Sequence, residues 1–257
     1  MRVARAHAYG CGMTVILLRH GRSTANTSGV LAGRSPGVHL DDRGREQADD
    51  LVSRLGDHLA EIKAVVRSPL DRCAETVAPL LAALGTNGDR PPEVVVDDLA
   101  EVDYGGWTGR SISELLKEPL WKVVQQQPSA AVFPDGEGLA DVQARAVRAV
   151  RDLDRIYGGP DGSGVWVACS HGDVIKSIVA DAMGSHLDAF QRIVVEPASI
   201  SVIRYASSRP YVHTVNNTQK LSIPTPRPPA GDDQQASDDA VVGGDTGATA
   251  TVPATSG

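Results

Sequence analysis

Two histidines that each follow a short apolar run constrain the fold of this chain most strongly. His20 comes after the run at residues 14–18, and His171 comes after the run at residues 165–169. In both cases one polar residue precedes the histidine and a glycine follows it. Both runs are rich in β-branched residues, which is typical of buried strands. Because the carboxyl ends of strands form the binding crevice of an open α/β sheet, the repeated pattern predicts two imidazoles in one pocket.

Strand-like and helix-like segments alternate along most of the chain, and this alternation predicts the fold class. Helical patterns are expected after Asp41, after Pro69, near residues 111–117 and 119–127, and over about 139–156 and 172–183. Strands are expected at residues 14–18, 62–66, 93–96, 164–169, 199–205 and 211–216. We therefore expect an α/β protein, a three-layer α/β/α sandwich whose mostly parallel sheet has about six strands.

Composition excludes several classes of partner. The 257 residues are 41% hydrophobic, which is enough for a sizeable core, and the net charge of −7 argues against a general nucleic-acid binder. No apolar stretch approaches 18 residues, so we expect no membrane partner. The three cysteines include no Cys-x-x-Cys pair, which favours a reducing compartment over a disulfide framework and predicts a cytoplasmic location.

The ends of the chain differ in composition from its middle. Met13 lies just before the first predicted strand, so residues 1–12 are interpreted as an N-terminal extension. Residues 221–257 are rich in Pro, Gly, Asp and Thr with almost no large apolar side chain, so they are predicted to be a disordered tail. The sequence thus predicts one domain over residues 13–220.

The residues around the two histidines favour phosphate chemistry. No Gly-Lys dipeptide, no cysteine with an arginine six residues later and no close histidine pair is present, which excludes a P-loop, a cysteine-phosphatase loop and a simple metal motif. Arg19 adjoins His20, Asn26 follows in the same loop, and Arg72 lies in the first turn of a predicted helix. Arginine forks suit phosphoryl oxygens. Taken alone, Arg72 and the loop residue Glu101 are more typical of solvated surface positions than of a binding site.

Four segments in the right order resemble the signature of the histidine phosphatase superfamily, the phosphoglycerate mutase-like proteins. They are residues 18–26 (Leu-Arg-His-Gly-x-Ser-x-x-Asn), 68–76 (Ser-Pro-Leu-Asp-Arg-Cys-Ala-Glu-Thr), 101–109 (Glu-Val-Asp-Tyr-Gly-Gly-Trp-Thr-Gly) and 170–172 (Ser-His-Gly). Residues 40–48 also fit the first helix of the family, with Asp41 where a threonine cap is usual. The resemblance covers about residues 14–216.

The resemblance implies a role for each matching residue. His20 would be the nucleophile that forms a phosphohistidine, neutral and with its second ring nitrogen donating to a backbone carbonyl. Glu101 would protonate the leaving alkoxide and later take a proton from water, which requires a raised carboxyl pKa. His171 would complete the catalytic set. No cofactor and no metal are expected, because arginines and histidines would supply the positive charge. The implied phosphate-binding residues are Arg19, Ser23, Asn26, Arg72, His171 and Gly172.

Several departures favour a phosphatase over a mutase. The family's mutases carry Trp immediately before the loop asparagine, where this chain has Ala25. Asp103 replaces a residue that would favour binding of a second phosphate. Residues 135–142 resemble the phosphatase branch, and the segment over 115–133 is apolar. We therefore expect hydrolysis of a small phosphorylated metabolite, and the resemblance implies that the chain can form a homodimer. The alternatives are a cofactor-dependent phosphoglycerate mutase and a non-catalytic protein that binds phosphorylated ligands.

Overall fold

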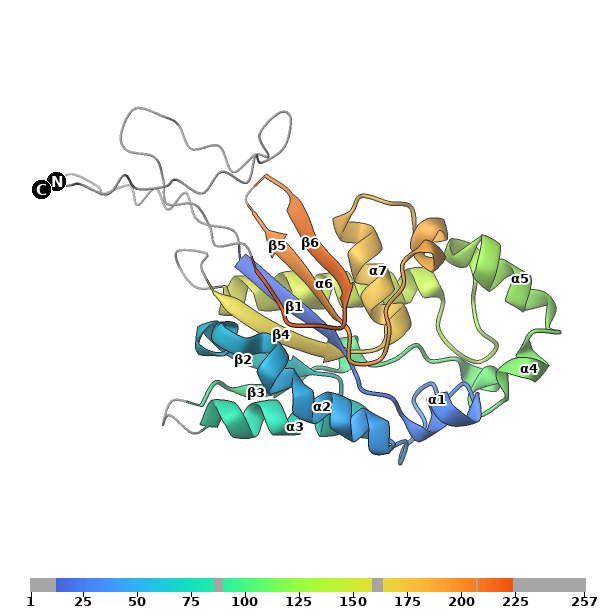
Figure 1. The fold of residues 1–257 in the computed structure, drawn as a ribbon. Coiled ribbons are helices and arrows are strands. Elements are labelled where there is room, and N and C mark those ends of the chain that lie inside the picture. Colours follow the sequence, from blue (N-terminus) through green and yellow to red (C-terminus); the bar gives the residue numbers. More distant parts are fainter. Residues whose placement is uncertain (1–12, 86–89, 159–163, 207, 224–257) are drawn as a thin grey trace, which may run out of the picture. The chain divides into compact units, whose positions relative to one another are not determined.

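Six strands form one mixed sheet in the computed structural model, which describes residues 13–85, 90–158, 164–206 and 208–223 (Figure 1). The strand order is β3-β2-β4-β1-β5-β6. The first four of these are mutually parallel, β5 is antiparallel to β1, and β6 is antiparallel to β5. The mostly parallel sheet predicted from the sequence is thereby confirmed. The strands are β1 (Met13–Arg19), β2 (Ile62–Arg67), β3 (Glu93–Val95), β4 (Val165–Ser170), β5 (Ile200–Tyr205) and β6 (Pro210–Asn217).

Helices cover both faces of the sheet, as a three-layer sandwich requires. In Figure 1, α2 and α3 lie on one face and α6 and α7 on the other. The α-helices are α1 (Thr24–Ser28), α2 (Asp42–Leu55), α3 (Asp71–Leu84), α4 (Ile112–Leu115), α5 (Pro119–Gln126), α6 (Leu139–Tyr157) and α7 (Gly172–Ala182). Short 3₁₀ segments lie at Gly56–Glu61, Asp97–Leu99, Gly105–Trp107, Pro128–Ala130 and Leu187–Arg192. Among the described residues, no helix is long and apolar enough to cross a membrane.

The side chains of β1 alternate between two hydrophobic cores. Val15 and Leu17 pack in the core that contains α6 and α7, whereas Ile16 and Leu18 pack in the core that contains α2 and α3. This alternation follows from the period of two along a strand. Both faces of β1 are therefore apolar, which explains why the sequence shows an unbroken apolar run rather than an alternating one.

The carboxyl ends of β1 and β4 bring the two histidines together. The strands pair in a register that sets Arg19 opposite Ser170, so His20 and His171 leave the sheet at the same edge. The backbone N–H of His20 donates to the carbonyl of Ser170 at 3.0 Å, and the two imidazole centroids are 5.2 Å apart. The prediction of two imidazoles at one edge of the sheet is confirmed.

Two expected boundaries differ in detail. The helix expected to open at Pro69 begins at Asp71, because the chain bends at Pro69 and Leu70 and Leu70 is still extended; the Ser68 hydroxyl contacts Nε2 of His171 at 2.8 Å. Packing also continues beyond residue 220: Leu221 is 4% exposed, and its N–H donates to the carbonyl of Arg54 at 2.7 Å. The predicted extension at 1–12 and residues 224–257 of the predicted tail lie outside the described residues.

Candidate active site

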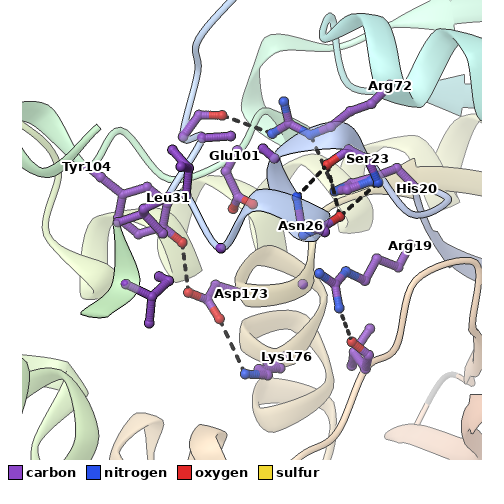
Figure 2. Close-up of a pocket in the computed structure, with 18 residues that line it drawn as sticks. Arg19, His20, Ser23, Asn26, Leu31, Arg72, Glu101, Tyr104, Asp173 and Lys176 are labelled. Carbon is purple, nitrogen blue, oxygen red and sulfur yellow. Dashed lines mark hydrogen bonds and ion pairs between the residues drawn. The ribbon is translucent and has the colours of Figure 1, made fainter. Parts of the chain in front are cut away.

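A cavity of about 270 Å³ opens at the edge of the sheet where β1 and β4 end. Figure 2 shows that its lining comes from several elements, including the loop after β1, the start of α3 and the start of α7. His171 is fully buried beside His20, next to this cavity. The structure therefore gathers all the site residues expected from the sequence. Those that line the cavity are Arg19, His20, Ser23, Asn26, Arg72, Glu101 and Gly172.

The geometry around His20 determines which ring nitrogen carries the proton and which carries the lone pair. Its Nδ1 lies 2.7 Å from the carbonyl oxygen of Gly21, which can only accept, so Nδ1 carries the proton. Nε2 therefore holds the lone pair and accepts a bond from Nε of Arg72 at 3.3 Å. Burial, followed by the charges of Arg72 and Arg19, lowers the pKa of His20 well below its usual value. The imidazole is thus neutral and correctly oriented for a nucleophile.

His171 is neutral as well, and its contacts fix the tautomer. Its Nδ1 accepts from Nη2 of Arg72 at 3.2 Å, so Nε2 carries the proton and donates to the Ser68 hydroxyl at 2.8 Å. Burial first, and then the charge of Arg72, lowers the pKa of His171 well below its usual value. The expectation that histidines supply positive charge does not hold for the free site, where the two imidazoles offer hydrogen bonds and the arginines carry the charge.

Arg19 and Arg72 retain unused donors in buried positions. Arg19 Nη1 donates to the carbonyl of Val195 at 2.6 Å, and Arg72 Nη2 donates to that of Gly33 at 2.9 Å. Arg19 Nε and Arg72 Nη1 are buried without a hydrogen-bond partner among the described residues. A buried N–H without a partner is destabilising, so two such donors on cationic side chains indicate a site built for an anion.

The first turn of α7 lies against Arg19. A Cβ atom at Gly172 would lie 3.4 Å from both Cζ and Nε of the Arg19 guanidinium, at the edge of ordinary van der Waals contact. Helix α7 begins at Gly172, with His171 at its N-cap. The amino-terminal end of a helix carries a partial positive charge and free N–H groups, which adds to the anion-binding character of the cavity.

Ser23 and Asn26 form a capping box at the start of α1. The Asn26 side-chain oxygen accepts from the Ser23 backbone N–H at 3.0 Å and from the Ser23 hydroxyl at 2.9 Å. Because Oδ1 is held in this way, the amide nitrogen is the end of the Asn26 side chain that can donate to a ligand. Ser23 lines the cavity, but its hydroxyl proton is directed to Asn26, so in the free site it positions its neighbour.

Glu101 has the protonation behaviour expected of a general acid. Its side chain is 13% exposed, Oε1 accepts from the N–H of Val102 at 3.0 Å, and Oε2 lies 3.8 Å from Nδ1 of His171. Burial, followed by the nearby charge of Asp173, raises the pKa of Glu101 to about 7, against the opposing effect of Arg72. The carboxyl group can therefore donate and accept a proton near neutral pH. Asp103, the other acidic residue of this loop, instead accepts from the N–H of Gly105 at 3.0 Å.

A partly buried ion-pair network contacts the Glu101 loop. Arg145 donates to both carboxylate oxygens of Glu137, at 2.9 and 3.0 Å, and to the backbone carbonyl of Glu101 at 3.2 Å. Arg34 donates to the same carbonyl at 2.8 Å and pairs with Glu137 at 2.9 Å. Glu137 also accepts from the N–H of Asp103 at 3.0 Å. The network thus holds the loop at the Glu101 carbonyl and at the Asp103 N–H, and sequence reasoning did not identify it.

Three further residues on the cavity wall were also missed from the sequence. The hydroxyl of Tyr104 donates to Asp173 at 2.9 Å, and the ammonium of Lys176 donates to the other oxygen of Asp173 at 3.4 Å. All three line the cavity. The available signal was local, because Asp173 directly follows the second His-Gly pair and Lys176 lies three residues further along the same helix face.

No group of three or more His, Cys, Asp or Glu side chains is placed to hold a metal ion within the described parts of the chain. The cationic groups that line the cavity are Arg19, Arg72 and Lys176. Arg19 remains an arginine cation although burial lowers its pKa. These side chains give the cavity nitrogen donors that could bind a phosphoryl group.

The sequence of this chain is similar to those of known proteins. Residues 15–218 match the family described as the histidine phosphatase superfamily, branch 1. The chain is 33% identical over 217 residues to the bifunctional protein Rv2228c of Mycobacterium tuberculosis, an alignment that covers 83% of this chain and 56% of that protein. It is 28% identical over 193 residues to an adenosylcobalamin/α-ribazole phosphatase of Escherichia coli, covering 74% and 89% of the two chains. The alignment with the mycobacterial protein thus spans just over half of that relative's length.

The fold is also shared with solved structures. The crystal structure of the α-ribazole phosphatase from Shigella flexneri superposes with a TM-score of 0.70 and 23% sequence identity. The superposition covers 82% of this chain and 100% of that one. At this level of identity the likeness establishes the common α/β fold.

Proposed function

The chain belongs to the histidine phosphatase superfamily, branch 1, and on this basis we propose that it hydrolyses phosphomonoesters of small metabolites through a phosphohistidine on His20. The observation that carries the proposal is the neutral His20, whose Nε2 lone pair lies beside two buried arginines with unused N–H donors. A nucleophile, an anion site and a carboxyl group with a pKa of about 7 meet in one cavity. These are the components that phosphoryl transfer needs.

In the first half-reaction, Nε2 of His20 attacks the phosphorus atom and the bond to the alcohol oxygen breaks. Protonated Glu101 gives its proton to the departing oxygen, and the alcohol leaves. The phosphorylated ring keeps its Nδ1–H on the carbonyl of Gly21, which stabilises the positive charge that the ring acquires. Arg19 and Arg72 together balance the two negative charges of the phosphoryl group, and Asn26 and the start of α7 add N–H donors.

In the second half-reaction, the Glu101 carboxylate removes a proton from water while the water oxygen attacks phosphorus. The P–N bond breaks, and its electron pair returns to Nε2 of His20. Inorganic phosphate leaves, and Glu101 is again protonated. One carboxyl group serves both halves, because its pKa of about 7 lets it exist in either form near neutral pH.

Hydrolysis is favoured over a mutase reaction by the charges of the cavity. A mutase must retain a doubly phosphorylated intermediate, which requires cations beyond those that hold the first phosphoryl group. Besides Arg19 and Arg72, the cationic residue that lines the cavity is Lys176, and Asp173 partly neutralises it at 3.4 Å. A second phosphate would therefore be held poorly, and water would complete the reaction.

The experiment compares phosphate release by the wild type and His20→Ala, with His213→Ala as a matched control at an exposed position of β6. The wild type and the control should hydrolyse p-nitrophenyl phosphate and carry an acid-labile, base-stable phosphate after quenching. His20→Ala should show neither property. Vanadate should inhibit, and EDTA should have no effect. Turnover by His20→Ala within tenfold of the wild type would exclude the covalent mechanism. Faster interconversion of 3- and 2-phosphoglycerate than phosphate release would establish the mutase instead.

A further inference from the structure

We propose that Tyr104, Asp173 and Lys176 form a subsite for the alcohol half of the substrate, and that this subsite selects a neutral alcohol rich in hydroxyl groups, such as a polyol or a sugar. The inference rests on the proposed phosphatase function, since it concerns the group that leaves when His20 attacks. It adds the chemical class of the leaving group, which neither the family nor the phosphate-binding residues determine.

The three side chains form a continuous polar row on the cavity wall. Figure 2 shows Tyr104, Asp173 and Lys176 linked to one another, on the side of the cavity away from His20 and Arg72. The Asp173 and Lys176 side chains are only 23% and 19% exposed, and Tyr104 is buried. Tyr104 packs edge-on against Phe133, with the ring centroids 4.9 Å apart. The row is therefore a fixed part of the wall, and it lies next to the space that an alcohol would occupy.

Each member of the row keeps hydrogen-bonding capacity for a ligand. Asp173 uses one oxygen for the Tyr104 hydroxyl and the other for Lys176, and each carboxylate oxygen can accept a further bond. Lys176 has three N–H donors, of which one goes to Asp173 and one to Gln191 at 3.3 Å. The Tyr104 oxygen can still accept. The row thus offers both acceptors and a donor within a few ångströms.

The charges of the row favour a neutral ligand. Asp173 and Lys176 form an ion pair whose formal charges cancel. A carboxylate on the ligand would be attracted by Lys176 but repelled by Asp173. An ammonium group would be attracted by Asp173 but repelled by Lys176. A hydroxyl group donates to one partner and accepts from the other, so it uses both without a charge conflict.

The remaining wall of the cavity is aliphatic. Val30, Leu31 and Ile112 line it, and Leu31 and Ile112 pack against the hydrophobic core that contains α6 and α7. These side chains offer contact to carbon–hydrogen groups and no hydrogen bond. A polar row together with aliphatic side chains in one cavity matches a polyol or sugar, which carries hydroxyl groups on an aliphatic carbon frame.

The test uses four phosphate esters of similar size that differ in the alcohol: glycerol 3-phosphate, propyl phosphate, 3-phosphoglycerate and phosphoethanolamine. For the wild type, kcat/KM should be highest for glycerol 3-phosphate, about tenfold above propyl phosphate, because hydroxyl groups would bond to charged partners. The two charged esters should both rank below glycerol 3-phosphate. A wild-type preference for either charged ester, or equal rates for all four, would overturn the inference.

Two substitutions test the charges separately. Asp173→Asn should raise the ratio of kcat/KM for 3-phosphoglycerate over glycerol 3-phosphate at least fivefold, because repulsion of the carboxylate is lost. Lys176→Met should raise the ratio of kcat/KM for phosphoethanolamine over glycerol 3-phosphate, because repulsion of the ammonium group is lost. Lys176→Arg keeps the positive charge and should show the wild-type order of kcat/KM among the four esters. Ratios within one variant are compared because Asp173 also acts on the pKa of Glu101, and that effect is common to all alkyl esters. The matched control is Lys63→Met at an exposed position of β2.

The outcomes separate this inference from the function on which it rests. If phosphate is released from these esters but both variants keep the wild-type ratios, the subsite is wrong and the phosphatase stands. If p-nitrophenyl phosphate and all four esters are inert in the wild type, both proposals fail. A change in the ratios of the Lys63→Met control equal to that of Lys176→Met would also refute the subsite.

Discussion

Replacing Glu101 by glutamine should remove activity and stabilise the protein in the same step. The folded site raises the pKa of this carboxyl group from 4.5 to about 7, chiefly by burial. One pKa unit corresponds to about 1.4 kcal/mol, so ionised Glu101 lowers the free energy of unfolding by about 3 kcal/mol. Glutamine keeps the shape of the side chain but never ionises. It can still accept the Val102 N–H through its remaining oxygen.

The sign of the effect depends on pH. Well below pH 4.5 the carboxyl group is protonated in both the folded and the unfolded chain, so wild type and variant should have nearly the same stability. Between pH 4.5 and 7 the unfolded chain releases its proton first, and the free energy of unfolding of the wild type falls as the pH rises. Above pH 7 the whole effect is present. At pH 8, Glu101→Gln should therefore melt about 6–12 °C higher than the wild type.

Thermal melts at pH 4.5 and pH 8, paired with kinetics, provide the assay. For alkyl phosphates kcat should fall by about 10²–10⁴, and the loss should be smaller for p-nitrophenyl phosphate, whose leaving group hardly needs a proton. Glu46→Gln, at an exposed position of α2, serves as the control and should change neither property. The reasoning would be refuted if Glu101→Gln melted at or below the wild-type temperature at pH 8. It would also be refuted if the melting temperature rose by the same amount at both pH values. An equal fall in kcat for both substrates would show that Glu101 is not the general acid.

Three other outcomes follow from the same structure. As the pH rises above about 7, wild-type kcat/KM for alkyl phosphates should fall, because Glu101 loses the proton that it must donate; a pH profile checks this. Glu137→Gln weakens the bidentate pair that clamps the Glu101 loop, so kcat for alkyl phosphates should fall by about tenfold and more than for p-nitrophenyl phosphate, as steady-state kinetics would show. Removal of residues 224–257 should leave the melting temperature and kcat unchanged, whereas removal from the buried Leu221 onwards should cost about 2 kcal/mol in a denaturant titration.

The parts of the fold that could be predicted from the sequence are those determined by local patterns. An apolar run with β-branched residues determines a buried strand by itself, and β1 and β4 begin and end within one residue of their predicted bounds. Asp41 caps α2 as expected, accepting from the N–H of Gly44 at 2.8 Å. The meeting of the two histidines at one edge could be anticipated because both strands end in the same residue pair, and the carboxyl ends of strands form the binding crevice of an open α/β sheet.

The residues that sequence reasoning missed act through tertiary contacts. Arg145 lies on α6, 44 positions from the Glu101 carbonyl that it contacts. The sequence around a buried arginine on a helix does not differ from that around an exposed one. Only the fold therefore shows which group the arginine contacts. Asp173 has a local signal in its position after the second His-Gly pair, but an acidic residue in the first turn of a helix is also explained by the helix dipole. Its effect on Glu101 appears only when the start of α7 and the acid loop face the same cavity.

Arg72 is the residue on which the chemistry of the site depends most closely. It donates to Nε2 of His20 and to Nδ1 of His171, so in the free site the arginine occupies the lone pair that the nucleophile needs. Attack by His20 therefore requires that the bond from Arg72 be exchanged for one to the phosphoryl group. The exchange is favourable, because a neutral imidazole is a weaker acceptor for a guanidinium than a phosphate oxygen that carries charge. Arg72 Nη1, buried without a partner, is already free to make the first of these new bonds. In the proposed mechanism, the binding of the anion and the release of the nucleophile are thus one event, since both depend on the same guanidinium group.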